Sequence, residues 1–171
     1  MVGCHGDART RCKERPITQH GGSKILAVAS GGGHWTQLLR LRPAFEGCEV
    51  VYVSTISGHA AQVEGSRFFT VPHASRWERR RALVCALRLT WLVLRVRPNV
   101  IVSTGALPGF FAVAAGKTLL RRRTIWVDSI ANADELSLSG RLAGRFSDVW
   151  LTQWEHLATE DGPTFAGSVI H

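Results

Sequence analysis

The stretch that most constrains this chain is an apolar segment that runs directly into a glycine-rich turn. Residues 24–29 are apolar after the first position, and leucines recur at helical spacing beyond the turn. This order predicts a strand, a tight turn and the start of a helix. Glycine lets backbone N–H groups approach an anion closely, and a helix N-terminus adds partial positive charge. The turn consists of Ser30, Gly31, Gly32, Gly33 and His34. The pattern favours an anion-binding site at this turn, and an ordinary strand–helix connection without a ligand is the alternative.

Strands and helices alternate along the rest of the chain. This alternation predicts an α/β fold, a Rossmann-like doubly wound parallel sheet with the strand order 3-2-1-4-5-6. Residues 1–23 are polar and mixed in charge, so we expect a flexible N-terminal extension there and one folded domain over 24–171. The expected strands are 24–29, 49–54, 68–71, 99–103, 124–127, 149–152 and 164–170, and the expected helices are 35–45, 75–97, one that ends at 120, and 139–146.

A second glycine-containing turn follows the fourth expected strand. In this strand order the first and fourth strands are neighbours, and ligands bind in the crevice between their connections. Two glycine turns that face one crevice suit a diphosphate, with two ordinary connections as the alternative. A dinucleotide is disfavoured, because the second strand ends in Ser54 and Thr55 where an acidic residue would bind the ribose. The diphosphate-binding residues expected in the second turn are Thr104, Gly105 and Gly109.

His34 and Asp128 are the candidate catalytic residues. His34 begins the helix beside the first turn, and a free imidazole titrates near neutral pH. A general base, a phosphate ligand and a structural cap are three open roles for this histidine. Asp128 ends the fifth expected strand and is the best nearby carboxylate, with an N-cap of the following turn as its alternative role.

The charge of the chain favours phosphate-bearing partners. The net charge is +8, and nearly all of the cations are arginines. Nucleic acid is disfavoured, because Tyr52 is the single tyrosine and no stripe of aromatic and basic residues is present. The four cysteines match no standard zinc spacing, so neither a metal nor another cofactor is expected.

An arginine ridge and a surplus of apolar residues mark the expected helix 75–97. Arginines recur there every seven residues, so they drift by only about 20° per step and share one side. The apolar residues exceed what one side packed on a sheet requires, which fits a membrane interface or a partner protein. A wide core-facing helix with a solvated arginine edge is the alternative. The residues expected on this surface are Arg81, Arg88, Trp91 and Arg95.

Five motifs follow one another in order within 24–170: GGGH at 31–34, STGALPG at 103–109, VDSI at 127–130, LSLSG at 136–140 and QWE at 153–155. Together these motifs resemble those of a family of bipartite glycosyltransferases. They resemble the acceptor-side subunit of the two-part UDP-N-acetylglucosamine transferase of N-glycan synthesis, and more closely its PssD-type bacterial relatives in capsule and exopolysaccharide assembly. The paired glycine turns are also similar to those of the N-terminal domain of MurG, which face a lipid-linked diphosphate acceptor.

This resemblance implies the N-terminal half of a GT-B glycosyltransferase, a half that binds a polyprenyl-diphosphate-linked sugar acceptor at the membrane. A partner subunit would bind the nucleotide sugar, because one Rossmann-like domain cannot enclose both substrates, and the chain would be inactive alone. The two glycine turns would hold the acceptor diphosphate, and His34 or Asp128 would help to deprotonate the attacking hydroxyl. A non-catalytic membrane scaffold that recruits a catalytic subunit is the alternative.

The chain departs from this family at two points. Eukaryotic members begin with a membrane-spanning helix that this chain lacks, so the arginine-bearing helix would hold it at the membrane. Asp128 stands where many relatives carry glutamate, which is one methylene longer. Following the bacterial relatives, we expect a peripheral protein at the cytoplasmic face of a bacterial inner membrane.

Overall fold

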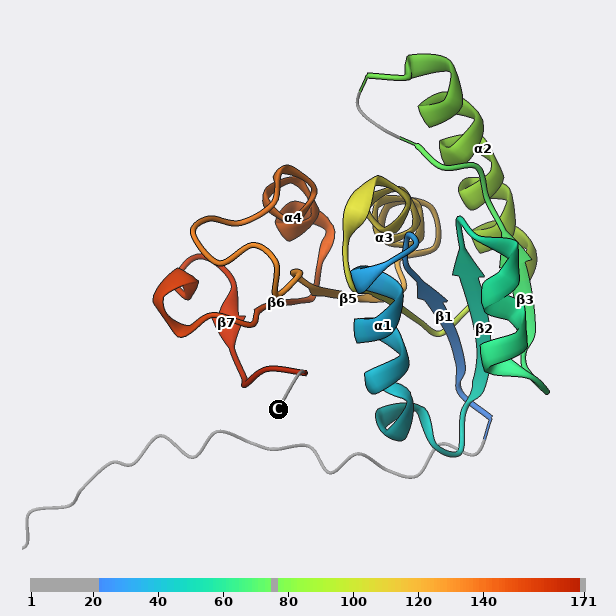
Figure 1. Cartoon of the computed structure of the whole chain (residues 1–171). Helices are drawn as coiled ribbons and strands as arrows, with labels where there is room; N and C mark the ends of the chain where they lie inside the picture. The colour runs from blue at the N-terminus through green and yellow to red at the C-terminus, as the bar shows by residue number, and fades with distance from the viewer. Residues whose placement is uncertain (1–21, 75–76, 170–171) are drawn as a thin grey trace, which may run out of the picture.

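The computed structural model describes residues 22–74 and 77–169, which form a seven-stranded sheet between two helical layers (Figure 1). The strand order is β3-β2-β1-β4-β5-β6-β7, and every pairing is parallel. The predicted Rossmann-like doubly wound sheet is confirmed, and β7 extends it by one strand. The strands are β1 (Lys24–Val28), β2 (Glu49–Ser54), β3 (Arg67–Thr70), β4 (Val100–Ser103), β5 (Arg123–Val127), β6 (Val149–Thr152) and β7 (Thr164–Phe165).

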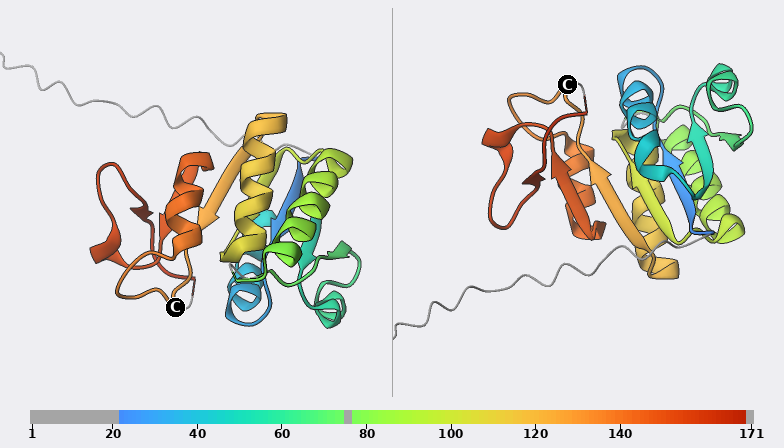
Figure 2. Two further views of the ribbon diagram at one scale, coloured as in Figure 1. Left: turned by 90° about the horizontal axis from the view of Figure 1, so that it is seen from above. Right: turned by 90° about the horizontal axis from the view of Figure 1, so that it is seen from below.

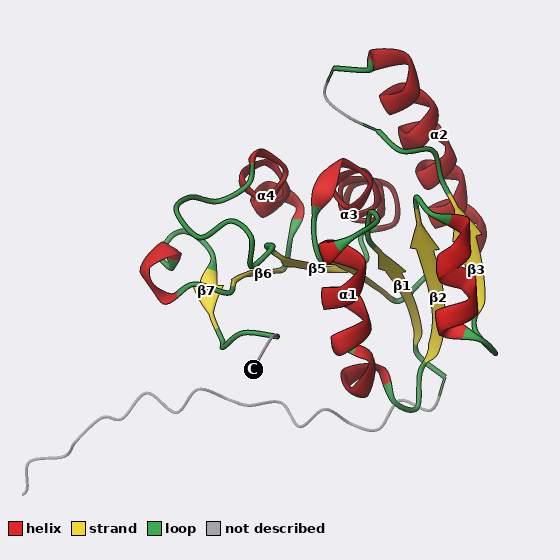
Figure 3. Cartoon of the chain, in the orientation of Figure 1, coloured by secondary structure: helices red, strands yellow, loops and turns green. Residues whose placement is uncertain are grey.

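Helices cover both faces of the sheet (Figure 2, Figure 3). One face carries α1 with two short 3-10 helices, whereas α2, α3 and α4 lie side by side on the other face. The helices are α1 (Gly33–Arg40), α2 (Arg79–Val96), α3 (Ala106–Leu120) and α4 (Leu138–Ala143). The 3-10 helices are η1 (Arg42–Phe45), η2 (Ser57–Val63), η3 (Gly144–Phe146) and η4 (Glu155–Leu157).

The central strands are apolar on both sides because helices cover both faces of the sheet. In β1, Leu26 and Val28 belong to the core beneath α2 and α3, whereas Ile25 and Ala27 belong to the core beneath α1. Successive side chains of a strand point to opposite faces, so a strand of this kind must be apolar throughout. This burial fixes the position of β1, and with it the glycine turn that follows at its carboxyl end.

Three of the expected elements differ from the structure. The helix expected over 35–45 ends at Arg40 and continues as η1, because Pro43 has no N–H for a helical hydrogen bond. The last strand has two residues rather than spanning 164–170, since Gly167 adopts a positive φ of 99° and turns the chain away. Helix α2 begins at Arg79, and residues 75–76 and 1–21, the latter most of the expected extension, lie outside the described residues.

No helix within residues 22–74 and 77–169 combines the length and apolar character that crossing a bilayer requires.

Candidate functional site

The two glycine turns lie against each other at the carboxyl edge of the sheet, and His34 joins them. The Thr104 hydroxyl donates a hydrogen bond of 2.7 Å to the carbonyl oxygen of His34. The imidazole ring lies directly over Gly105, where a Cβ atom would be 2.7 Å from Nε2. Only glycine leaves room for the ring at this position. The predicted meeting of the two turns is therefore present in the structure.

The first turn leaves the N-terminus of α1 open. Gly32 adopts a positive φ of 68° at the N-cap, and no side chain of the described residues caps this end of the helix. Gly32 and Gly33 are exposed, whereas the N–H of Gly31 donates to the Thr55 hydroxyl at 3.0 Å. Ser30, which precedes the glycines, is buried. An exposed, uncapped helix N-terminus is a favourable place for an anion.

The second turn is more enclosed than the first. Gly105 is the N-cap of α3 with a φ of 132°, and its N–H donates to the Ser103 hydroxyl at 3.2 Å. Thr104 and Gly105 are buried beneath the His34 ring. Gly109 lies inside α3, where a Cβ atom would approach the Ser103 Cβ to 3.0 Å and the Trp126 ring to 3.3 Å. This turn supports the histidine, and the absent side chain of Gly109 lets α3 pack closely on the sheet.

The environment of His34 favours its neutral form. Burial lowers the pKa of this imidazole below its ordinary value of 6.5, and the charge of Asp128 opposes that effect only in part. The Ser30 hydroxyl lies 3.0 Å from Nδ1 and 3.4 Å from the Gly31 carbonyl oxygen, and it can donate its single proton to one of them. When the hydroxyl donates to the carbonyl, Nδ1 carries the ring proton and Nε2 is the acceptor; when it donates to Nδ1, Nε2 carries the proton. In the first of these two tautomers, Nε2 is the nitrogen that can accept a proton.

Asp128 holds the loop that follows β5 in place. Its side chain is buried, with 1% of its surface exposed. One carboxylate oxygen accepts from the Ser137 hydroxyl at 2.7 Å and from the Trp126 indole at 3.1 Å. The other accepts from the Ser137 N–H at 3.1 Å and from the Asn132 amide at 3.2 Å. Four donors surround this carboxylate, so its main role in the structure is to position the loop and the start of α4.

A pair of buried glutamines links the first turn to the same loop. Gln37 donates to the Gly33 carbonyl and the Ser129 hydroxyl, both at 3.1 Å, and its carbonyl accepts the Ile130 N–H at 3.1 Å. Gln153 donates to Gln37 at 2.6 Å and to the Asp128 carbonyl at 2.8 Å. Sequence reasoning assigned no role to Gln37, although a glutamine at a buried position of an amphipathic helix was a usable signal.

Helix α2 carries the predicted arginine ridge and an exposed apolar stripe beside it. Arg81, Arg88 and Arg95 are exposed, and Arg81 forms an ion pair of 2.8 Å with Glu78. Leu87 and Trp91 expose 62% and 57% of their surfaces. The N-terminal half of α2 projects away from the rest of the chain (Figure 1). The complete stripe consists of Leu83, Val84, Leu87, Trp91 and Leu94.

Comparison with known families and curated proteins gives a consistent result. Residues 78–169 match the family described as Oligosaccharide biosynthesis protein Alg14 like. The chain is 27% identical to UDP-N-acetylglucosamine transferase subunit alg14 of Schizosaccharomyces pombe, over 86% of this chain and 81% of that protein. It is 25% identical to the Homo sapiens subunit, over 82% of this chain and 80% of the relative. A shorter match to the Eremothecium gossypii subunit reaches 38% identity, over 43% of this chain and 35% of that protein.

Solved structures with a similar fold are GT-B enzymes. MurG of Acinetobacter baumannii aligns with a TM-score of 0.68 and 11% identity, over 84% of this chain and 45% of that chain. UDP-GlcNAc 2-epimerase of Neisseria meningitidis, solved with UDP-GlcNAc bound, aligns with a TM-score of 0.63 and 12% identity, over 85% of this chain and 47% of that chain. The chain thus spans about half the length of these structures, and the likeness establishes the Rossmann-like fold of one GT-B half.

The predicted location at a bacterial inner membrane is wrong. The curated relatives are eukaryotic proteins from fungi and mammals, whose cells have no such membrane of their own. The resemblance rested on glycine turns and polar motifs that suit a ligand, and such motifs carry no information about the compartment. The match over residues 78–169 spans more than half of the 171 residues, and the chain belongs to the Alg14-like family of oligosaccharide biosynthesis proteins.

Proposed function

We propose that this chain is the acceptor-binding subunit of a UDP-N-acetylglucosamine-dependent glycosyltransferase that acts on a polyprenyl-diphosphate-linked sugar. Membership of the Alg14-like family supports the reaction class, because curated relatives carry the name UDP-N-acetylglucosamine transferase subunit. The observation that carries the proposal within the chain is the His34 ring, which lies between two glycine turns at one edge of the sheet. Assembly in an exopolysaccharide pathway stays a prediction without support from these relatives.

The first turn is the proposed binding site for the acceptor diphosphate. Gly32 and Gly33 are exposed at the uncapped N-terminus of α1, which offers backbone donors and partial positive charge. Ser30 lies beside them and contacts His34. Thr104 and Gly105 support this site from the second turn, whereas Gly109 serves the packing of α3. We expect the diphosphate to bind without a metal, because the backbone donors of this turn would stabilise its charge.

His34 is the proposed general base, with Asp128 as a positioning residue. Nε2 would take the proton from the acceptor hydroxyl as the hydroxyl oxygen forms a bond to the anomeric carbon of the donor sugar. The bond between that carbon and the UDP oxygen would break, and UDP would leave with the electron pair. The lowered pKa of His34 supports this role, because the ring is neutral at neutral pH. Asp128 already accepts four hydrogen bonds and would instead hold the loop at the edge of the site.

The exposed stripe of α2 is the proposed membrane-facing surface. Leucines and a tryptophan lie beside three exposed arginines on one helix, which suits the interface of an anionic membrane. A polyprenyl carrier resides in the bilayer, so a subunit that binds its head group must approach the membrane. The donor half would come from a partner subunit, since the chain spans about half of the GT-B enzymes that share its fold.

Reconstitution with the nucleotide-sugar-binding partner tests the proposal. Sugar transfer from UDP-N-acetylglucosamine to a polyprenyl-diphosphate sugar should require both subunits. His34→Ala should lower kcat by about 100-fold or more, the usual contribution of a general base. His156→Ala is the matched control, because this exposed histidine lies in η4 and contacts only the Ala133 carbonyl among the described residues through its ring nitrogen.

Two outcomes would overturn parts of the proposal. Full turnover by the isolated chain would exclude a half-enzyme, and unchanged kcat in the His34→Ala complex would exclude the proposed base. A scaffold that only recruits a catalytic subunit predicts that no substitution in either glycine turn changes the rate. It also predicts that substitutions on α2 remove membrane binding and transfer together.

A further inference from the structure

A cationic cavity lies at the opposite edge of the sheet from the glycine turns. Its volume is about 360 Å³, and it is lined by Lys117, Arg121, Arg122, Arg123 and Asp148. Arg123 is the first residue of β5, and Asp148 immediately precedes β6. The glycine turns follow the carboxyl ends of β1 and β4, whereas this cavity lies at the amino ends of parallel strands. It is therefore separate from the proposed acceptor site.

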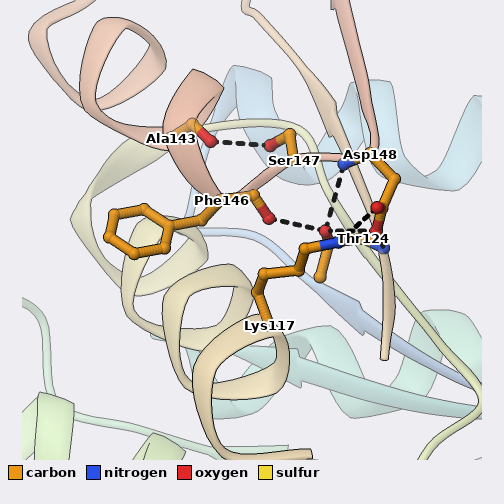
Figure 4. A network of polar contacts seen from close by, with 6 residues as sticks. All are labelled: Lys117, Thr124, Ala143, Phe146, Ser147 and Asp148. Atoms are coloured by element: carbon orange, nitrogen blue, oxygen red, sulfur yellow. Dashed lines mark hydrogen bonds and ion pairs between the residues drawn. The ribbon is translucent and has the colours of Figure 1, made fainter. Parts of the chain in front are cut away.

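The acidic side chain that lines the cavity, Asp148, already has hydrogen-bonding and ionic partners within the chain. Lys117 forms an ion pair with Asp148, and Thr124 donates its N–H at 2.9 Å and its hydroxyl at 3.1 Å to the other carboxylate oxygen (Figure 4). Partial burial acts to raise the pKa of Asp148, but the bonds from Lys117 and Thr124 outweigh it, and the net direction is downward. Asp148 is therefore ionised at neutral pH, and Lys117 and Thr124 use its acceptor capacity.

The three arginines have no such partner. Among residues 22–74 and 77–169, no acidic side chain forms an ion pair with Arg121, Arg122 or Arg123. The Nε atom of Arg122 is buried and lacks a hydrogen-bond acceptor in this part of the chain. A buried donor of a charged group left without an acceptor costs more than an ordinary hydrogen bond contributes. Three guanidinium groups thus line the cavity without an acidic partner among the described residues.

The position of these cations is only partly explained by the helix beside them. Lys117 lies in the last turn of α3, and Arg121 caps its C-terminus, where positive charge is favourable. That effect falls off within one turn, so it does not account for Arg123 in the strand. An anion bound between the three guanidinium groups would account for the positive charge of Arg123 at this position.

We propose that this cavity binds a phosphate-bearing anion. A planar guanidinium group can donate two parallel hydrogen bonds to the oxygens of one phosphate. The three adjacent arginines also carry more positive charge than the carboxylate of Asp148 can balance. Free phosphate or diphosphate and the phosphate of a lipid head group share this chemistry. The site is independent of the glycine turns, so it can be present whether or not the proposed transferase activity is correct.

Residue-resolved NMR with inorganic pyrophosphate tests the site on the full chain. In the wild type, the amides of 121–124 should shift saturably, and any shift at Gly32 and Gly33 reports separately on the proposed acceptor site. The double variant Arg122→Gln/Arg123→Gln should weaken the response at the cavity by about tenfold or more. Arg67→Gln, an exposed arginine at the far edge of the sheet, removes one charge and should leave the affinity within about twofold.

The two sources of phosphate are separated by a second measurement. Vesicles of phosphatidylcholine with and without phosphatidic acid are compared for co-sedimentation and for line broadening of the amides of 121–124. Loss of phosphatidic-acid-dependent binding in the double variant, together with pyrophosphate binding, supports a head-group site, and pyrophosphate binding alone supports a site for a soluble phosphate. Absence of saturable shifts at 121–124 in the wild type, or equal affinity in the double variant, would overturn the proposal. Neither result would bear on transfer by the His34 site.

Discussion

The Thr104 hydroxyl and the His34 carbonyl oxygen lie 2.7 Å apart, and this hydrogen bond joins two turns that are 70 residues apart in sequence. The two turns follow β1 and β4, which are paired neighbours in the middle of the sheet. The bond therefore holds the two turns together at the carboxyl ends of these strands. Thr104 is buried, which protects the bond from competition by water. Thr104, Gly105 and His34 meet at this contact, and each of them gives a prediction that can be measured.

Thr104→Val should destabilise the protein by about 1–3 kcal/mol. Valine keeps the shape of threonine but removes the donor, which leaves the His34 carbonyl oxygen without its partner. Urea unfolding of the purified chain measures the difference. Thr104→Ser is the matched variant, because it retains the hydroxyl and should lose less than half as much. Equal losses in both variants would show that packing of the methyl group, rather than the hydrogen bond, matters at this position.

Gly105→Ala should destabilise the chain by about 1–3 kcal/mol and displace the His34 ring. Alanine at a φ of 132° is strained, and its Cβ would lie 2.7 Å from Nε2 of the ring. In a His34→Ala background the collision disappears and only the backbone strain remains, so the cost should be smaller. Gly58→Ala is the control, because no atom of residues 22–74 and 77–169 lies within 4 Å of that Cβ position. Additive losses in the double variant would contradict the contact described here.

The pH dependence of stability should change when His34 is replaced. The folded-state pKa of His34 lies below the unfolded value of 6.5, so the unfolded chain binds more protons as the pH falls below 6.5. The contribution of the neutral ring is therefore fully present above pH 6.5 and is lost as the pH falls through the folded pKa. His34→Gln should flatten this part of the curve. Urea unfolding between pH 5 and pH 8 measures it.

A second histidine provides the comparison for that experiment. Burial also lowers the pKa of His59, which stacks on Trp35 with ring centroids 4.6 Å apart. His59→Gln should flatten the curve in the same direction, and the double variant should combine the two effects. If His34→Gln leaves the slope below pH 6.5 unchanged while His59→Gln removes it, the lowered pKa belongs to His59 alone.

Gln37→Leu should destabilise the protein by about 1–3 kcal/mol and loosen the loop after β5. The side chain is 2% exposed, and leucine leaves the Ile130 N–H and the Gln153 amide without their shared acceptor. Hydrogen exchange of the Ile130 amide is the direct readout and should become faster than that of β1. Thr36→Leu changes an exposed neighbour on the same helix and should have little effect. Unchanged exchange at Ile130 would exclude the proposed link.

Leu87→Gln/Trp91→Gln should weaken binding to anionic vesicles without lowering stability. Both side chains are more than half exposed, so little buried apolar surface is lost on substitution. Co-sedimentation with vesicles measures binding, and the melting temperature measures stability. Leu142→Gln on α4 is the control for an exposed leucine outside the stripe. Vesicle binding that survives the double substitution would move the membrane surface away from α2.

The sheet was predictable because each central strand carries its own local signal. Strands such as β1 and β2 are short apolar runs between turns, and their alternation with helices fixed the order of the first six strands. The break at Pro43 was equally local, yet the apolar spacing around it concealed the change from α1 to η1. The meeting of the two glycine turns also followed from the order of the strands.

The roles of single residues depended on contacts that no local pattern contains. Gly105 and Gly109 are both required by close packing, one against an imidazole ring and the other against Ser103 and Trp126, and a glycine motif does not separate these causes from ligand binding. The exposed stripe on α2 depended on how much of the helix the sheet and α3 cover. Gln37 meets Gln153 across 116 residues, which only the folded chain brings together.

The contact between Asp128 and Gly140 determines how closely α4 approaches the sheet. A Cβ atom at Gly140 would lie 2.9 Å from the carboxyl carbon of Asp128, so there is no spare room between them. A glutamate at 128 would place its carboxylate one methylene further along this line and push the helix outward. The short acid therefore acts as a spacer, and the distance between α4 and the carboxyl end of β5 depends on the length of one side chain.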